Sequence, residues 1–144
     1  MRGEARKALL ADFIREVWSQ GRIEACDTYL AQRYTIHHDP GDPWDGQQLD
    51  RAGFKERVRQ SRAPFPDQRF DLRELLADGD AVAAAWLWSA TQQGVFAGFP
   101  PSGHRLKMSG ITIYYFDAED RITGHWQVAD RLGVWRQLSS GCPA

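Results

Sequence analysis

The 144-residue chain is predicted to fold as one α+β domain in which N-terminal helices cap a strongly curved antiparallel sheet. Apolar residues recur at helical spacing in the first half of the chain, whereas the second half alternates with a period of two. Helices followed by hairpin-linked strands are typical of α+β domains rather than of alternating α/β folds. The sequence contains no repeat, linker or low-complexity segment, so residues 1–144 are treated as a single domain.

The first half is predicted to contain three helices. The longest carries Leu9, Phe13 and Val17 on one face and charged residues on the other, and Gly21 follows it as a typical C-terminal stop. Residues 38–46 are rich in Pro, Gly and Asp, which predicts a loop. The helices are predicted over residues 4–20, 23–31 and 51–62, and residues 33–38 are predicted to be extended.

The second half is predicted to contain four strands. Asp78-Gly79-Asp80 forms a hairpin turn, and residues 94–103 form a loop. Strands of about 10 to 14 residues exceed the usual five or six, and a long antiparallel sheet twists and coils. The sequence therefore predicts a cone-shaped cavity between the sheet and the helices. The strands are predicted over residues 69–77, 81–92, 104–117 and 121–130, and a short terminal helix over residues 132–138.

Both faces of the strand at residues 81–92 are apolar. Trp86 and Trp88 point to one face, and Ala85 and Leu87 point to the other. A strand with one wet face would alternate with polar residues, so both faces are predicted to be covered. The helices cover one face. A second copy of the sheet is the simplest cover for the other, because symmetric dimers are the commonest oligomers. The sequence thus predicts a homodimer that associates through the convex face.

Charge and composition argue against several classes of protein. The net charge is −1, and no basic segment is suited to nucleic acid or anionic lipid. No apolar run approaches the ~20 residues of a membrane span, and the charged N-terminus is no signal peptide, so a soluble, cytoplasmic protein is predicted. Cys26 and Cys142 form no CxxC motif, which disfavours a zinc site or a disulfide framework. Phosphate-binding and dinucleotide-binding glycine loops are absent from the sequence.

Aromatic residues make up 12% of the chain, which is enough for a large core and for the lining of a ligand pocket. If they line a pocket, the ligand is expected to be small, flat and hydrophobic. The alternative for each residue is a place in the ordinary core. The candidate lining residues are Phe13, Trp18, Phe65, Trp86, Trp88, Phe99, Met108 and Trp126.

Five segments carry a resemblance when they are taken in order: residues 13–18 followed by Gly21, the His38-Asp39-Pro40 motif, Phe65-Pro66-Asp67, residues 94–103, and Gly124-His125-Trp126 followed by Asp130. In this order and spacing they resemble the SnoaL-like polyketide cyclase family of the nuclear-transport-factor-2-like superfamily. The resemblance covers nearly the whole chain and implies a cystatin-like α+β barrel with a cone-shaped sheet. It further implies an enzyme that closes a ring by intramolecular aldol condensation, without metal or cofactor, on a small polyketide-like carbonyl substrate.

Asp130 is the first candidate for catalysis, because it resembles the acidic residue near the end of the last strand in the family's cyclases. Aldol ring closure needs a base to remove a proton next to a carbonyl and an acid to protonate the new alkoxide. One carboxyl performs both steps when an apolar pocket raises its pKa. Asp130 follows Trp126 and Val128 on one strand face and is expected to face such a pocket. The alternative role is an N-cap for the terminal helix.

Two histidines accompany Asp130 as catalytic candidates. His38 matches the family's histidine before Asp-Pro, and a neutral imidazole there would stabilise an enolate or transfer a proton. Its alternative role is to tie the strand to the Pro-rich loop. His125 matches the family's His-Trp pair. It alternates with Trp126, so it shares a face with Asp130 only if the strand is bulged.

The sequence leaves three functions open, because proteins that share this fold have many different activities. The first is the cofactor-independent cyclase or isomerase. The second is an enzyme of the epoxide-hydrolase type, for which the sequence shows no convincing Asp-Arg-Asp set. The third is a non-catalytic dimeric module that binds a small molecule.

Overall fold

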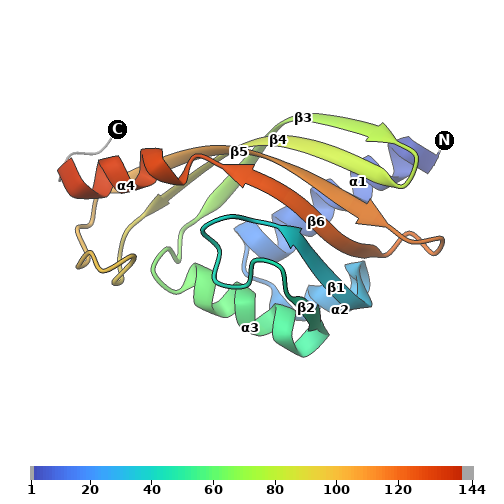
Figure 1. The fold of residues 1–144 in the computed structure, drawn as a ribbon, viewed down its shortest axis with the longest axis horizontal. Coiled ribbons are helices and arrows are strands. Elements are labelled where there is room, and N and C mark those ends of the chain that lie inside the picture. The colour runs from blue at the N-terminus through green and yellow to red at the C-terminus, as the bar shows by residue number, and fades with distance from the viewer. Residues whose placement is uncertain (1, 141–144) are drawn as a thin grey trace.

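The computed structural model describes residues 2–140 and shows a six-stranded sheet that arches over the N-terminal helices (Figure 1). The strand order is β2-β1-β6-β5-β4-β3, with β1 parallel to β6 and all other neighbours antiparallel. This confirms the predicted α+β class with a curved sheet. The elements are α1 (Arg2–Phe13), η1 (Ile14–Ser19), η2 (Ile23–Ala25), α2 (Cys26–Tyr29), β1 (Leu30–His38), β2 (Gln48–Asp50), α3 (Arg51–Arg62), β3 (Arg69–Asp78), β4 (Ala81–Thr91), β5 (Arg105–Phe116), β6 (Ile122–Ala129) and α4 (Arg131–Ser140).

The predicted first helix is present, but its C-terminal part is a π-helix, η1. There the backbone N–H of Gln20 donates to the carbonyl of Arg15, five residues earlier. Single π-turns of this kind widen a helix locally and are common beside functional sites. In η1 the turn buries Ile14 and Val17 and brings Trp18 to the cavity described below.

The second predicted helix is shorter than expected, because β1 already begins at Leu30. The third helix matches the prediction, and Asp50 caps it by accepting a hydrogen bond from the backbone N–H of Gly53 at 2.7 Å. The sequence analysis missed β2, a three-residue edge strand that pairs with β1. Of the two cysteines, Cys26 is a buried free thiol, and Cys142 lies outside the described residues.

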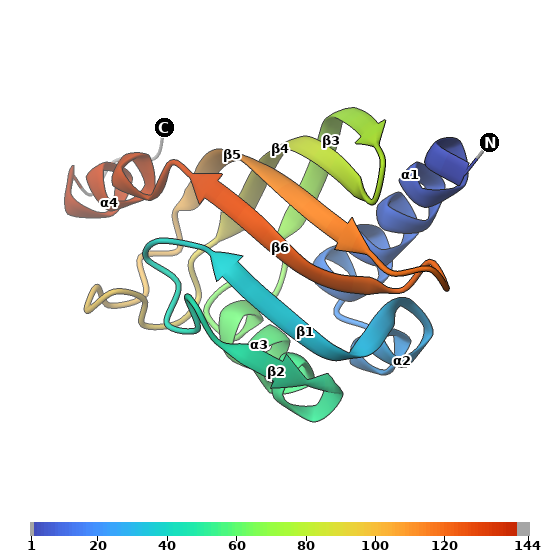
Figure 2. The ribbon, with the colours of Figure 1, turned by 45° about the vertical axis from the view of Figure 1, so that its right-hand side comes forward.

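The core lies between the helices and the concave face of the sheet, where Val82, Ala84 and Trp86 of β4 are buried. Figure 2 shows α1, α2 and α3 on this same side. Phe54 of α3 packs against Phe13 and Tyr34, with ring centroids 6.2 and 4.6 Å apart. The helices therefore close one end of the cone by aromatic contacts and leave the other end to α4 and two loops.

A buried arginine fixes the N-terminal helix to the two hairpin turns at the far end of the sheet. Arg6 donates to the Asp120 carboxylate at 2.8 Å and to the backbone carbonyls of Gly79 and Asp117 at 3.1 and 2.9 Å. Hydrogen bonds from a charged donor are stronger than neutral ones, and three of them hold α1 across the sheet. This contact sets the tilt of α1 and hence the position of η1 beneath the cavity.

The convex face of the sheet carries exposed apolar side chains from β4, β5 and β6, which we call the outer patch. Its members are Leu87, Ile111, Trp126 and Val128, and Ile111 lies directly opposite Val128 in the sheet. The apolar character expected of both sheet faces is present, whereas the homodimer stays a prediction.

Within residues 2–140, no helix is long and apolar enough to cross a membrane, and the cytoplasmic location stays a prediction.

Candidate active site

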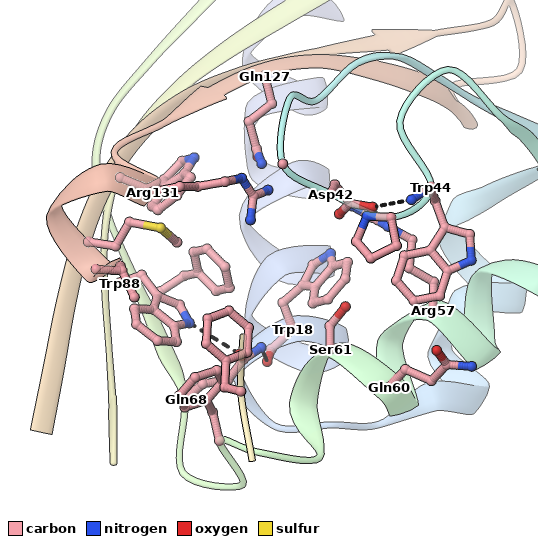
Figure 3. A pocket seen from close by; sticks show the side chains of 18 of the residues that line it. Trp18, Asp42, Trp44, Arg57, Gln60, Ser61, Gln68, Trp88, Gln127 and Arg131 are labelled. Carbon is pink, nitrogen blue, oxygen red and sulfur yellow. Dashed lines mark hydrogen bonds and ion pairs between the residues drawn. The ribbon is translucent and has the colours of Figure 1, made fainter. Parts of the chain in front are cut away.

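A cavity of about 710 Å³ occupies the open end of the cone (Figure 3). Its volume lies in the usual range for sites that enclose a small organic molecule. The concave face of the sheet, η1, α3, α4 and the loops around residues 42 and 96 supply its walls. The lining residues on which the following argument depends are Trp18, Tyr34, Asp42, Trp44, Arg57, Phe65, Phe70, Trp86, Trp88, Met108, His125, Gln127, Arg131 and Trp135.

Much of the cavity wall is aromatic, and its rings contact one another. Phe65 lies edge-on to Trp88 with centroids 5.0 Å apart, and Phe70 lies edge-on to Trp86 at 5.1 Å. The indole Nε1–H of Trp88 donates to Gln68 at 3.1 Å, so its polar atom is satisfied within the protein. A wall of fixed aromatic rings presents large, flat contact area at low cost in side-chain entropy.

One corner of the cavity is polar, and a buried carboxylate organises it. Asp39 is 1% exposed and follows the last residue of β1. Its carboxylate accepts hydrogen bonds from His125 Nε2 at 2.8 Å, from Gln127 Nε2 at 3.1 and 3.2 Å and from Arg131 Nη2 at 2.9 Å. We call this group the polar cluster; its full membership is Tyr34, Asp39, Asp42, Arg57, His125, Gln127 and Arg131.

The polar cluster fixes the charge on Asp39. Burial by itself would raise the pKa of this carboxyl, but the hydrogen bond from His125 and the charges of Arg57 and Arg131 hold the pKa below its ordinary value. Asp39 is therefore an anion near neutral pH. An ionised carboxylate only accepts hydrogen bonds, so every group that faces it must donate.

This requirement fixes the tautomer of His125. Burial lowers the pKa of His125, and this effect exceeds the opposing hydrogen bond to Asp39, so the ring is neutral near pH 7. Because Nε2 faces the Asp39 anion at 2.8 Å, the single ring proton lies on Nε2. Burial also raises the pKa of Tyr34 well above its ordinary value, so its hydroxyl keeps its proton and donates to His125 Nδ1 at 2.6 Å. Nδ1 is therefore the basic nitrogen of the cluster.

Arg57 of α3 joins the polar cluster to the loop after β1. Its Nη2 donates to Asp42 at 2.9 Å and lies 3.4 Å from Asp39. Burial would lower the pKa of Arg57, but the two carboxylates outweigh it and keep the guanidinium charged. In the described part of the chain, its Nε is buried without a hydrogen-bond partner. Figure 3 shows Asp42 and Trp44 on this loop, on the side of the cavity opposite Trp88.

Comparison with known proteins identifies the family to which this fold and site belong. A sequence model of SnoaL-like polyketide cyclases matches residues 8–138. The chain belongs to the SnoaL-like polyketide cyclase family. Comparison with the curated proteins gives no match.

Among solved structures, a candidate polyketide cyclase from Acidithiobacillus ferrooxidans is 58% identical, with a TM-score of 0.91 over 95% of this chain and 96% of that one. IdmH from Streptomyces antibioticus, also a candidate polyketide cyclase, is 25% identical with a TM-score of 0.76 over 93% and 98% of the two chains. TsrD from Streptomyces laurentii shares the fold, with 24% identity and a TM-score of 0.78 over 94% and 96%.

The structure brings together only part of the lining that the sequence predicted for this SnoaL-like domain. Phe13 is instead buried in the core against Tyr29, Phe54 and Tyr114. Phe99 lies at the rim, where its ring contacts Trp135 with centroids 6.5 Å apart. The predicted residues that do line the cavity are Trp18, Phe65, Trp86, Trp88 and Met108.

His38 lies outside the cavity, contrary to expectation, because β1 carries a bulge. The register between β1 and β6 shifts between Ile36 and His38. A bulge adds one residue and reverses the face of every side chain after it. His38 consequently stacks on Trp126 at the outer patch, with ring centroids 4.2 Å apart, and Asp39 turns inward in its place.

Asp130 lies at the protein surface and does not line the cavity. Its carboxylate accepts the backbone N–H of Gly133 at 2.9 Å at the start of α4, which is the alternative N-cap role. The reason is the orientation of β6: His125 and Gln127 face inward, so Trp126 and Val128 face outward. The expectation that Asp130 faces an apolar pocket is thus wrong, whereas His125 does reach the site.

Sequence reasoning missed most of the polar cluster. Asp39 was quoted only as part of the His-Asp-Pro motif, although an acidic residue between His and Pro at the end of a strand was itself a signal. Gln127 was visible as the inward partner of His125 at a spacing of two. Tyr34, Arg57 and Arg131 carry no comparable signal, because their approach to Asp39 depends on how β1, α3 and α4 meet in space.

The buried pair of His125 and Asp39 predicts a distinct pH dependence of stability. The folded chain resists protonation of His125, whereas the unfolded chain takes that proton below about pH 6.5. The free energy of unfolding should therefore decrease as the pH falls through this value. A second decrease should follow near pH 3.8, because Asp39 has a lowered pKa in the folded state. Urea unfolding between about pH 8 and pH 2 measures both steps.

Replacing His125 with Gln removes the group responsible for the first step, so the decrease between about pH 7 and pH 5 should become shallower. His37→Gln, which removes an exposed histidine, provides a matched control variant. Equal slopes in all three proteins would show that His125 titrates alike in the folded and unfolded chains.

Proposed function

We propose that this SnoaL-like chain is a cofactor-independent cyclase in which His125, held by Asp39 and Tyr34, is the general base. The observation that carries the proposal is the hydrogen-bonded series Asp39–His125–Tyr34, with distances of 2.8 and 2.6 Å, at the polar corner of an aromatic cavity. In many acid–base sites a histidine acts through one ring nitrogen while its other ring nitrogen donates to a buried carboxylate. His125 has this arrangement, with Nε2 held by Asp39.

In the proposed reaction the protein contributes proton transfers, and the new C–C bond forms within the substrate. His125 Nδ1 removes a proton from the carbon next to a substrate carbonyl, and the Tyr34 hydroxyl turns from Nδ1 to donate to the resulting enolate oxygen. The enolate carbon then attacks a second carbonyl carbon of the same molecule and forms the new C–C bond. The imidazolium returns its proton to the new alkoxide, which restores the neutral ring. Asp39 stabilises the imidazolium between these two steps.

The cavity supports a small, hydrophobic, polyketide-like substrate with at least two carbonyl groups. Its aromatic walls favour flat rings, and its polar cluster gathers several hydrogen-bond donors at one corner. Within residues 2–140 no cluster of His, Cys, Asp or Glu is placed to hold a metal ion. The proton transfers proposed here are those that the side chains of the polar cluster can perform.

The proposal is tested with 2-tetralone, a flat bicyclic ketone, by following exchange of its α-protons for deuterium in D₂O by NMR. The wild-type protein should accelerate exchange, and His125→Gln should lower the rate by about 10²–10⁴-fold, the usual range for loss of a general base. Asp39→Asn should also slow exchange, because the imidazolium loses its counter-charge. Quenching of tryptophan fluorescence measures whether each variant still binds the ketone.

Asp130→Asn separates this assignment from the one made from the sequence. Asn is a good N-cap, so the variant should keep α4 and exchange at the wild-type rate. Loss of exchange in Asp130→Asn with full exchange in His125→Gln would return the catalytic role to Asp130. Fluorescence quenching without any exchange in the wild-type protein would indicate the non-catalytic binding module.

A second candidate function is epoxide hydrolysis, which one observation favours. Arg57 lies between the carboxylates of Asp42 and Asp39, so the structure contains an Asp-Arg-Asp set beside the cavity that was not evident from the sequence. In such a site a carboxylate, here Asp42, takes a proton from the attacking water, and the Arg57 guanidinium donates a hydrogen bond to the epoxide oxygen as its C–O bond breaks. The resulting alkoxide then takes the proton from Asp42. Styrene oxide hydrolysed in ¹⁸O-water tests this function: formation of labelled diol that Asp42→Asn abolishes would favour it over the cyclase.

We further propose that the outer patch is the interface of a homodimer. Contiguous exposed apolar side chains on a sheet are uncommon in monomers, and a second copy presents the same apolar surface. Sedimentation should then give twice the chain mass of 16.4 kDa. Ile111→Asp, at the centre of the patch, should shift the protein to monomer. The control variant Val95→Asp, which changes a more exposed side chain in a loop, should not. A wild-type monomer would refute the proposal.

A further inference from the structure

A series of hydrogen bonds crosses the sheet from the aromatic wall of the cavity to Asp39. Trp86 on β4 donates its indole Nε1–H to Thr112 Oγ1 on β5 at 2.9 Å. The Thr112 hydroxyl donates to Gln127 Oε1 on β6 at 2.6 Å, and Thr112 and Gln127 lie directly opposite each other in the sheet. Gln127 Nε2 then donates to both oxygens of Asp39.

The donor and acceptor chemistry of these groups gives the series a single direction. The Trp86 indole nitrogen only donates, so it must meet a lone pair of the Thr112 hydroxyl. The hydroxyl proton is then free to point at Gln127 Oε1. With its carbonyl oxygen engaged there, Gln127 presents its NH₂ group to Asp39. The opposite amide orientation would place an oxygen against the carboxylate and leave Thr112 facing a donor.

A missing side chain on β5 makes this series possible. Gly110 lies directly opposite Trp86 in the sheet, and a Cβ atom at position 110 would overlap the six-membered ring of the indole. The glycine therefore lets the ring lie across β5, with Nε1 reaching Thr112. Thr112 is fully buried, so no solvent replaces its hydroxyl as the partner of Gln127.

We propose that Thr112 is a positioning residue that acts on His125 through Gln127 and Asp39. Its hydroxyl sets the orientation of the Gln127 amide, so that the NH₂ group donates to the Asp39 anion, which in turn keeps the ring proton of His125 on Nε2. Thr112 itself does not touch the substrate in this scheme. The inference rests on the proposed function, because it assigns Thr112 a role in preparing the same base.

Thr112→Val keeps the shape of the side chain and removes the hydroxyl. Gln127 then loses its fixed orientation, and Asp39 loses donors that lower its basicity. Asp39 becomes a stronger acceptor for the His125 N–H, so the pKa of His125 should rise by about half a unit. The charged groups that shift the pKa of His125 are Asp39, Arg57 and Asp42. The Tyr34 hydroxyl and the Tyr114 ring also face His125, and Arg131 donates to Asp39.

The readout is the NMR titration of the His125 ring, together with the pH profile of α-proton exchange in 2-tetralone. In Thr112→Val the midpoint of the titration and the acid limb of the profile should both move upward. The rate on the acid side should fall about threefold, as a shift of half a unit requires. Thr112→Ser retains the hydroxyl and should restore both values. Thr123→Val, which removes a half-buried hydroxyl elsewhere in the sheet, should change neither.

The outcomes distinguish this inference from the proposed function. An unchanged His125 titration in a folded Thr112→Val protein would overturn the positioning role, whatever the activity. A titration shift that Thr112→Ser fails to reverse would also overturn it, because packing rather than the hydroxyl would then be responsible. A reversible titration shift in a protein that exchanges no protons would keep the hydrogen-bond series and reject the cyclase.

Discussion

The buried carboxylate of Asp39 is the constraint on which the functional end of the molecule depends. An isolated carboxylate at 1% exposure would cost several kcal/mol, so the fold must deliver donors to it. Those donors come from three elements besides the end of β1: Arg57 from α3, His125 and Gln127 from β6, and Arg131 from α4. Satisfying one charge therefore fixes the relative positions of four elements, and the cavity lies in the space between them.

The secondary structure could be predicted largely from sequence because its signals are local. Helical spacing around Phe13, the cap at Asp50 and the turn at Gly79 each depend on residues close in the chain. The π-turn of η1 escaped detection, because the same apolar residues satisfy an α-helical pattern. The strand β2 escaped for another reason: its three residues pair with β1 across the loop at residues 38–46, and so short a segment carries no period.

The site was harder to predict because it depends on which way two strands face. An apolar face usually points inward, and this rule assigned Trp126 to the cavity and, together with the resemblance to the family, favoured a catalytic Asp130. In the structure the inward face of β6 carries His125 and Gln127. The bulge in β1 likewise exchanged His38 for Asp39. Neither the orientation of β6 nor the bulge in β1 changes the secondary structure. Each of them changes which side chains face the cavity. The alternation of side chains along each strand was predicted correctly, but the side chains that point into the cavity were not.

The inverted polarity of β6 links the cavity to the outer patch. The inner face of this strand must supply donors to Asp39, and apolar side chains there would leave the carboxylate unsatisfied. The outer face has no such demand, and there Trp126 and Val128 extend the apolar surface begun by Ile111 on β5. A strand that is polar toward the interior and apolar toward the outside is stable when a second surface covers its outer face. The same alternation that places His125 inside the cone thus places the outer patch, which is the proposed dimer interface, on its outside.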